Sequence, residues 1–127
     1  MKARIVVDGS MEDRSLFKES DISSPTAALS SVLTVATIAA AQRRKVATMD
    51  VEKAYLESDM PSEVLVRLSP ILAKLLCQRD LSFRQFLDDR GSMIVKLNKA
   101  QFGCVESARL WYNTLSSKLV SLSRLLW

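Results

Sequence analysis

Asp50 is the residue of this chain whose type and setting most clearly suggest chemistry. It lies in residues 46–51, whose apolar and β-branched side chains predict a short buried strand. An ionised carboxylate in a buried strand is costly unless it is paired, hydrogen-bonded or bound to a metal. The simpler alternative is that Asp50 ends the strand and closes a turn. Asp50 is therefore a candidate metal ligand with a purely structural alternative.

Zinc and thiol chemistry lack their usual residues in this chain. There is no histidine, and the two cysteines, Cys77 and Cys104, do not have the spacing of a zinc site. We therefore expect both to be reduced thiols, buried or close to the surface, in an intracellular protein.

Length and composition predict one soluble domain or part of one. The chain has 127 residues, of which 48% are hydrophobic, and 18 Lys and Arg against 14 Asp and Glu give a net charge of +4. This basic excess favours anionic partners such as nucleic acid, although solubility explains it equally well. The longest apolar stretch, residues 27–41, is interrupted by Ser and Thr and is shorter than the ~20 residues of a membrane span. We expect neither a signal peptide nor a membrane partner.

The first half of the chain predicts a strand followed by a long helix. Residues 3–7 form the strand candidate, and an exposed connection leads to Ser24-Pro25, which can cap and begin a helix over residues 25–44. Arg43, Arg44 and Lys45 close that helix where cations suit its dipole, and a nucleic-acid contact is the alternative role for them.

The second half predicts two strands and two helices. We expect strands at residues 63–68 and 92–97 to pair around a helix at 71–78 and a helical turn at 82–89. Gly103 indicates a tight turn or a close backbone approach. A final amphipathic helix from Glu106 should bury one stripe, made of Ala108, Trp111, Leu115, Leu119 and Leu122. The fold class is α+β, a small, mainly antiparallel sheet packed on helices.

Four blocks of the sequence, in order, resemble signatures of Ty1/copia-type retrotransposon reverse transcriptases. The blocks are Lys2-Ala3-Arg4-Ile5-Val6, Ser24-Pro25, ATMDVEKAYL at residues 47–56, and VKLNKAQFG with SARLWY within residues 95–112. The resemblance implies part of a polymerase domain: a fingers-like part over residues 1–45, a palm-like part over 46–122 and a truncated tail at 123–127. It also implies an RNA template, a DNA primer and a deoxynucleotide as partners, in the cytoplasm or in virus-like particles.

The same resemblance assigns roles to particular residues. Asp50 and the backbone carbonyl of Val51 would hold Mg²⁺ for two-metal nucleotidyl transfer. Tyr55 would lie under the sugar of the incoming nucleotide and exclude a 2′-hydroxyl; otherwise it is a core aromatic. The turn at Phe102 and Gly103 would lie against the nucleotide and template. Lys2 and Arg4 would reach the nucleotide phosphates, or would be solvated surface residues.

The family's second metal motif, Tyr-x-Asp-Asp, has no counterpart downstream of Gly103. Phe86-Leu87-Asp88-Asp89 imitates its letters, but it lies upstream and its flanks predict an exposed helix terminus. Without those carboxylates we expect this chain alone to be inactive. Because its palm sheet would lack central strands, we also expect the isolated chain to be marginally stable. Glu106-Ser107-Ala108-Arg109 also departs from the family's Gln-Ala-Pro-Arg, which adds a negative charge near the turn.

Three functions therefore compete. The first is a fragment of an RNA-directed DNA polymerase. The second is a catalytically dead, transposon-derived module that binds nucleic acid through Lys2, Arg4 and the cations at 43–45. The third is a small α/β interaction domain whose likeness to a polymerase is coincidental, and the four ordered blocks argue against it.

Overall fold

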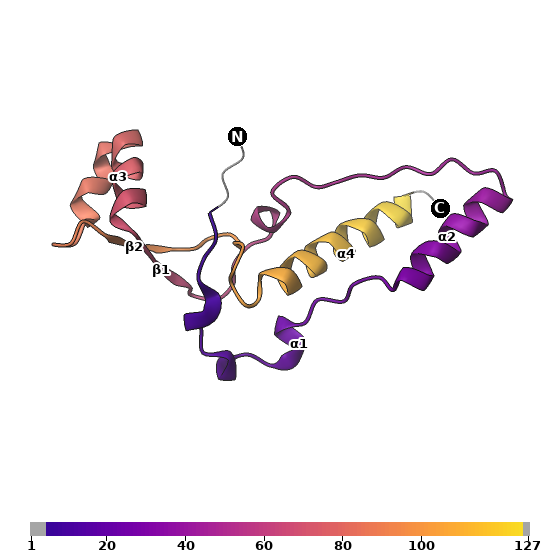
Figure 1. Ribbon diagram of the computed structural model, residues 1–127, viewed down its shortest axis with the longest axis horizontal. Coiled ribbons are helices and arrows are strands. Elements are labelled where there is room, and N and C mark those ends of the chain that lie inside the picture. Colours follow the sequence, from indigo (N-terminus) through magenta and orange to yellow (C-terminus); the bar gives the residue numbers. More distant parts are fainter. Residues whose placement is uncertain (1–4, 126–127) are drawn as a thin grey trace.

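The computed structural model describes residues 5–125 as an elongated arrangement of short elements (Figure 1). A two-stranded sheet with α3 lies at one end, α4 runs through the middle, and α2 lies at the other end. In chain order the elements are η1 (Gly9–Met11), η2 (Arg14–Leu16), α1 (Glu19–Ile22), α2 (Leu29–Ala41), η3 (Ala54–Glu57), β1 (Leu65–Leu68), α3 (Pro70–Arg79), η4 (Leu81–Phe86), β2 (Met93–Lys96) and α4 (Ser107–Leu125), where η denotes a 3₁₀ helix.

The predicted pairing of the two later strands is confirmed. β1 and β2 are antiparallel, with Leu65 opposite Lys96 and Leu68 opposite Met93. The predicted helix at 71–78 is also confirmed as α3, and its side chains Ala73 and Cys77 are buried with Met93 beneath the sheet. The fold is α+β, as expected.

A second core lies where the sheet meets α4. Met60, Ala100 and Cys104 are buried there, and Tyr55, Leu97 and Leu110 are among the side chains packed against them. Both cysteines are buried free thiols, as predicted, one in each core. The predicted stripe of α4 is only partly covered: Trp111 and Leu115 are half-buried, whereas Leu119 and Leu122 are each 54% exposed.

The long N-terminal helix is shorter than predicted. α2 begins after Ala28, and the hydroxyl of Ser24 makes no cap at its start. Arg43 adopts φ +52°, and the N–H groups of Arg43 and Arg44 donate to the carbonyls of Ala40 and Ala39. This is a Schellman end, which usually places Gly where Arg43 stands. Backbone capping therefore ends the helix, and the cations predicted to close it lie beyond its last turn.

The two predicted strands of the N-terminal half are absent from the described part of the chain. Residues 5–7 and 46–51 are extended, but the described residues contain only the β1–β2 sheet and neither segment pairs with it. Val46 and Met49 are 68% and 90% exposed. Among the described residues, no helix is both long and apolar enough to cross a membrane.

Candidate functional site

The candidate site begins with an extension of the sheet toward α4. Beyond β1 and β2 the same two chain segments stay paired: the N–H of Met60 donates to the carbonyl of Asn98 at 3.1 Å, and that of Ala100 donates to Ser58 at 2.9 Å. An ion pair between Lys99 and Asp59, 2.7 Å long, supports this pairing at the surface. Antiparallel pairing therefore brings the residues just before Ser58 close to those just after Ala100.

Tyr55 and Phe102 meet at the end of this paired ladder. Their ring centroids are 4.5 Å apart with planes inclined at 56°, a favourable tilted geometry. Tyr55 is half-buried and packs against the core of Met60, Ala100 and Cys104. The structure thus brings together two residues that the sequence places in separate blocks.

Gly103 forms the turn that leads toward α4, and both predicted properties are present. Its φ is +99°, a conformation that a side chain disfavours. A Cβ atom built on it would overlap the carbonyl oxygen of Val7 and lie 2.8 Å from the carbonyl carbon. Gly103 is therefore required by its own backbone angle and by the neighbouring segment.

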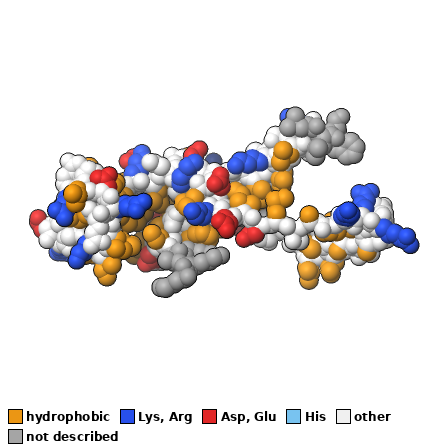
Figure 2. Space-filling view, turned by 90° about the horizontal axis from the view of Figure 1, so that it is seen from above, with side chains coloured by type: hydrophobic (Ala, Val, Ile, Leu, Met, Phe, Trp, Pro, Cys, Tyr) orange, Lys and Arg blue, Asp and Glu red, His pale blue; other side chains and the backbone are white. Residues whose placement is uncertain are grey.

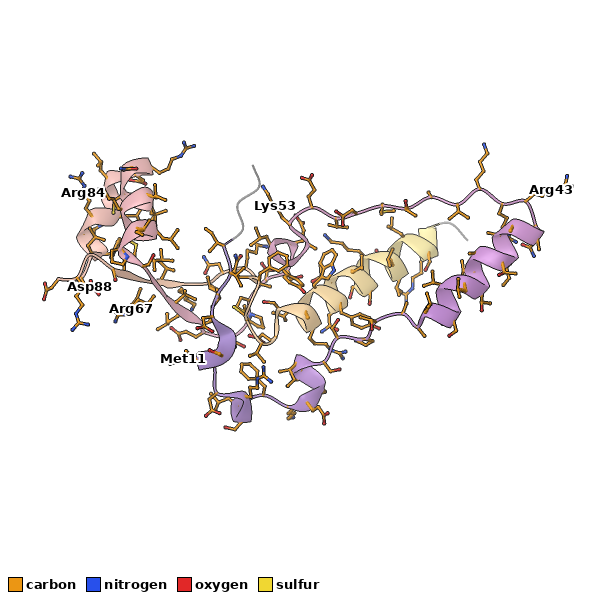
Figure 3. The ribbon with its side chains drawn as sticks, viewed as in Figure 1. Met11, Arg43, Lys53, Arg67, Arg84 and Asp88 are labelled. Carbon is orange, nitrogen blue, oxygen red and sulfur yellow. The ribbon has the colours of Figure 1, made fainter. Side chains whose placement is uncertain are left out.

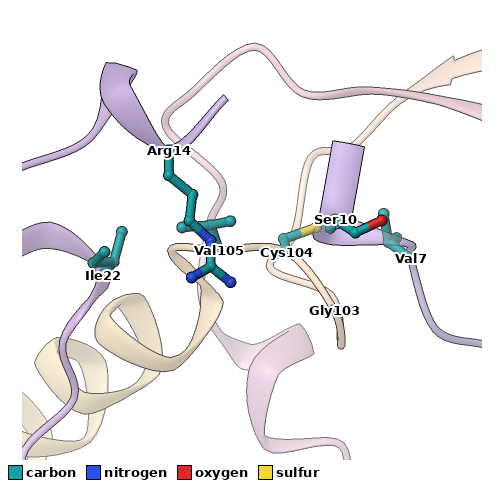
Figure 4. A pocket seen from close by; sticks show the side chains of 8 residues that line it. Val7, Ser10, Arg14, Ile22, Gly103, Cys104 and Val105 are labelled. Atoms are coloured by element: carbon teal, nitrogen blue, oxygen red, sulfur yellow. The ribbon is translucent and has the colours of Figure 1, made fainter. Parts of the chain in front are cut away.

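A hollow of about 450 Å³ lies between this turn and the N-terminal residues (Figure 4). Backbone and apolar side chains form most of its wall, and Arg14 contributes the one charged side chain among the lining residues. The lining residues are Val7, Gly9, Ser10, Arg14, Ile22, Gly103, Cys104 and Val105. Sequence reasoning missed this hollow because residues 10–23 have no pattern beyond that of an exposed connection.

Two carboxylates beside the turn have a buried oxygen without a partner. Oε2 of Glu12 accepts from the N–H of Val105 at 3.2 Å, but Oε1 of Glu12 and Oε1 of Glu106 are buried without a hydrogen bond. Burial, together with the charge of Glu12, raises the pKa of the Cys104 thiol. The family motif that the chain resembles has a neutral Gln where Glu106 stands, so this chain has an additional acidic side chain near the turn.

Asp50 and Val51 lie apart from this cluster, on the long extended segment between α2 and η3 (Figure 1). The prediction of a buried Asp50 is wrong: the residue is exposed, because the strand expected to bury it does not form. Val51 is 37% exposed, and Lys53 then turns the chain with φ +54°. Asp50 and Val51 are thus present in their motif, but the strand pairing that would hold them in place is absent from the described residues.

The donor set does not by itself fit Mg²⁺. Within residues 5–125 no three Asp, Glu, Cys or His side chains come together in a way that could hold a metal ion. Mg²⁺ requires near-octahedral oxygen ligation, and one exposed carboxylate on an unpaired segment does not fix that geometry.

Asp88 has a structural task in a turn. Its Oδ1 accepts from the N–H groups of Arg90 and Ser92 at 3.0 and 2.8 Å, and its Oδ2 pairs with Arg67 at 2.7 Å (Figure 3). The predicted helix terminus is instead a turn after η4, exposed as expected. The backbone donation from Ser92 lowers the pKa of Asp88. Lys2 and Arg4, the predicted phosphate contacts, lie outside the described residues.

Comparisons with known proteins agree with the order of the motifs. Residues 1–124 match the model of the family described as reverse transcriptase (RNA-dependent DNA polymerase). The chain is also 28% identical, over 120 residues, to the retrovirus-related Pol polyprotein from transposon TNT 1-94 of Nicotiana tabacum. That match covers 94% of this chain and 8% of the polyprotein. No solved structure matches the chain. Because the family match spans nearly all of the sequence, including the motif with Asp50 and the turn at Gly103, the chain belongs to the reverse transcriptase family and is related to copia-type Pol polyproteins.

Proposed function

We propose that this chain is a fingers-like and first palm-like segment of an RNA-directed DNA polymerase. The observation that carries the proposal is the family match over residues 1–124, which includes Asp50 within its motif. In the complete polymerase Asp50 and the carbonyl of Val51 would contribute to a Mg²⁺ site, with RNA template, DNA primer and deoxynucleotide as partners. The ring pair of Tyr55 and Phe102 supports a nucleotide-facing surface because it sets both motif residues beside Gly103.

The chain alone is proposed to be inactive. Asp50 makes no hydrogen bond or ion pair within residues 5–125, and no second carboxylate joins it in a metal-ligating group there. In-line nucleotidyl transfer with two metals needs several carboxylates that hold both ions a few ångströms apart. We expect no primer extension by this chain on an RNA template with Mg²⁺. Primer extension by the wild-type chain that is lost in the Asp50→Asn variant would contradict this part of the proposal.

A chimera tests the polymerase assignment. Residues 1–124 would replace the matching segment of the tobacco TNT 1-94 polyprotein, and primer extension on an RNA template would be measured. If Asp50 contributes a ligand, Asp50→Asn should lower the extension rate at least ~100-fold, since losing a metal ligand removes several kcal/mol of transition-state stabilisation. Asp59→Asn is the matched control, because Asp59 is also an exposed carboxylate, paired with Lys99. An active chimera that is insensitive to Asp50→Asn would overturn the assignment.

The cations beyond α2 favour a second candidate function, binding of single-stranded nucleic acid. Arg43, Arg44 and Lys45 are exposed at the far end of the molecule, and residues 22–49 contain no acidic side chain (Figure 3). Replacing all three with Ala should reduce the slope of log affinity against log salt by about two, as expected for losing three phosphate contacts. A filter-binding titration measures this, and an unchanged slope would exclude these cations.

A further inference from the structure

The N-terminal residues 5–12, here called the strap, cross the Gly103 turn and are attached to both of its sides. Nε2 of Gln101 donates to the carbonyl of Ile5 at 2.6 Å, and the N–H of Val7 donates to the carbonyl of Phe102 at 2.7 Å. On the far side of the turn, the N–H of Val105 donates to Oε2 of Glu12 at 3.2 Å. These hydrogen bonds connect residues that are more than 90 positions apart in the chain.

Two glycines allow the strap to approach this closely. A Cβ built on Gly9 would overlap the carbonyl oxygen of Gly103 and lie 3.1 Å from its carbonyl carbon. In the opposite direction, a Cβ built on Gly103 would overlap the carbonyl oxygen of Val7. Gly9 does not have a positive φ, so its requirement for glycine comes from the crossing alone. The obstructing atoms are backbone atoms, which cannot move aside without breaking the crossing.

The carboxylate of Glu12 is held in place although one of its oxygens lacks a partner. Its Oε1 is buried without a hydrogen bond, while Oε2 accepts from Val105. Leaving a buried carboxylate oxygen unsatisfied is unfavourable, and an exposed Glu side chain on a loose segment would rotate to water. The location of Glu12 therefore indicates that the strap as a whole fixes it against the turn.

We propose that the strap positions the Gly103 turn, with Gly9 and Glu12 as its positioning residues. They act through the turn: Gly9 lets the two backbones cross, and Glu12 holds the N–H of Val105. The ring of Phe102 packs against Tyr55, and its carbonyl accepts the hydrogen bond from the N–H of Val7, so the same crossing also holds Phe102. The claim that this turn faces a nucleotide rests on the proposed function. The claim that the strap holds the turn in place rests on the hydrogen bonds and glycine contacts alone.

Amide hydrogen exchange of the full chain, followed by NMR, tests the dependence. Gly9→Ala should lower the protection of the Val7 and Val105 amides at least tenfold and leave that of Met93 to Lys96 in β2 unchanged. Gly91→Ala is the control: the φ of Gly91, unlike that of Gly9, is positive, but a Cβ there meets only Pro70 at 3.8 Å and no backbone atom. It should leave the Val7 and Val105 amides protected. Unchanged protection of both amides in Gly9→Ala would overturn the proposal.

Glu12 provides a second variant in case Gly9→Ala does not fold. Glu12→Ala should expose the Val105 amide to exchange at least fivefold faster, and Glu12→Gln, which keeps an acceptor oxygen, should restore most of the protection. Equal exchange in Glu12→Ala and the wild type would overturn the role of Glu12.

A titration with Mg²⁺ and a deoxynucleoside triphosphate separates the strap from the nucleotide. If both proposals hold, the Phe102 and Gly103 signals of the wild type shift on titration, and Gly9→Ala weakens the apparent affinity at least fivefold. If those signals do not shift but the exchange results stand, the strap is supported and nucleotide binding at the turn of this chain is excluded. Equal affinities in wild type and Gly9→Ala would overturn the claim that the strap prepares the turn for a nucleotide.

Discussion

The surroundings of the Gly103 turn and the limb formed by residues 23–53 both contain many apolar side chains. Those at the turn include a buried core, whereas those of the limb are mostly exposed. At the turn, the strap, the extended ladder and the start of α4 enclose Met60, Ala100 and Cys104. Along α2, Ala39 is the one buried residue, and Leu29, Val32 and Leu33 are all more than half exposed. Figure 2 shows the apolar side chains of this limb facing solvent, with its cations at the tip. Apolar composition makes a core only where other segments cover it.

The same contrast divides the candidate functional residues. Tyr55, Phe102 and Gly103 are fixed by packing and by backbone constraints at the turn. Asp50 and Val51 lie on the limb, where neither a ladder nor a core holds them. A catalytic group must be held within about half an ångström of its working position. Part of the candidate site is therefore held in place in this chain, whereas Asp50, the proposed metal ligand, is not.

Gly103→Ala should have the largest effect on stability. Strain at a positive φ and overlap with the backbone of Val7 together predict a loss of about 4 kcal/mol of unfolding free energy. Urea denaturation followed by circular dichroism measures it. Gly91→Ala, which adds strain without overlap, should cost about 1 kcal/mol. Equal losses in the two variants would mean that the turn is no more constrained than an ordinary loop.

Met93→Ala and Leu33→Ala compare the two regions directly. Met93 is 1% exposed beneath the sheet, and its truncation should cost about 3 kcal/mol. Leu33 is 57% exposed on α2, so its truncation should cost less than about 0.5 kcal/mol. Urea denaturation of both variants provides the comparison. A large loss from Leu33→Ala would reveal that α2 is covered in solution.

Arg43→Gly should stabilise the limb without strengthening the core. Glycine removes the cost of a left-handed residue at the end of α2, worth about 1 kcal/mol for that helix. Hydrogen exchange in α2 should therefore slow by about fivefold, while the urea midpoint reported by Trp111 fluorescence, in a Trp127→Phe background, stays constant. A shift of that midpoint would show that the limb and the core unfold together.

Acid should weaken the turn before β2. The pKa of Asp88 is lowered chiefly by the N–H of Ser92, so its ionised form favours the folded state. That contribution is fully present above the unfolded pKa of Asp, about 3.9, and is lost as pH falls through the lower folded value. Amide exchange at Ser92 should accelerate in that range after correction for intrinsic rates. Asp88→Asn should remove this pH dependence, and its persistence in that variant would assign it to another group.

Local patterns predicted the elements that have partners. The β1–β2 pairing, α3, α4 and the Gly103 turn follow from alternation, capping residues and glycine, and the structure supplies each with a neighbour. The strand predicted at 46–51 is absent because periodicity indicates which face of a segment could be buried and says nothing about whether another strand pairs with it. Helix 25–44 was overextended because Ser24-Pro25 resembles a cap, whereas residues 24–28 remain outside the helix.

The candidate site was predictable only as separate motifs. Sequence reasoning placed Tyr55, Phe102 and Gly103 on one surface through family resemblance, and it had no physical signal for their contact. The strap was missed because each of its hydrogen bonds uses at least one backbone group, which every residue type carries, and because Gly9 looks like an ordinary turn residue after Asp8. Backbone contacts between segments so distant in the chain leave no periodic signature.

The two buried thiols provide a chemical reporter for each half of the fold. Cys104 lies in the core beneath the strap, and Cys77 lies in the core beneath the sheet. Burial raises the pKa of Cys104, so an alkylating reagent should modify it only when that core opens. The rates of modification at the two sulfurs would therefore time the opening of each core separately, in the unaltered chain and without an attached label.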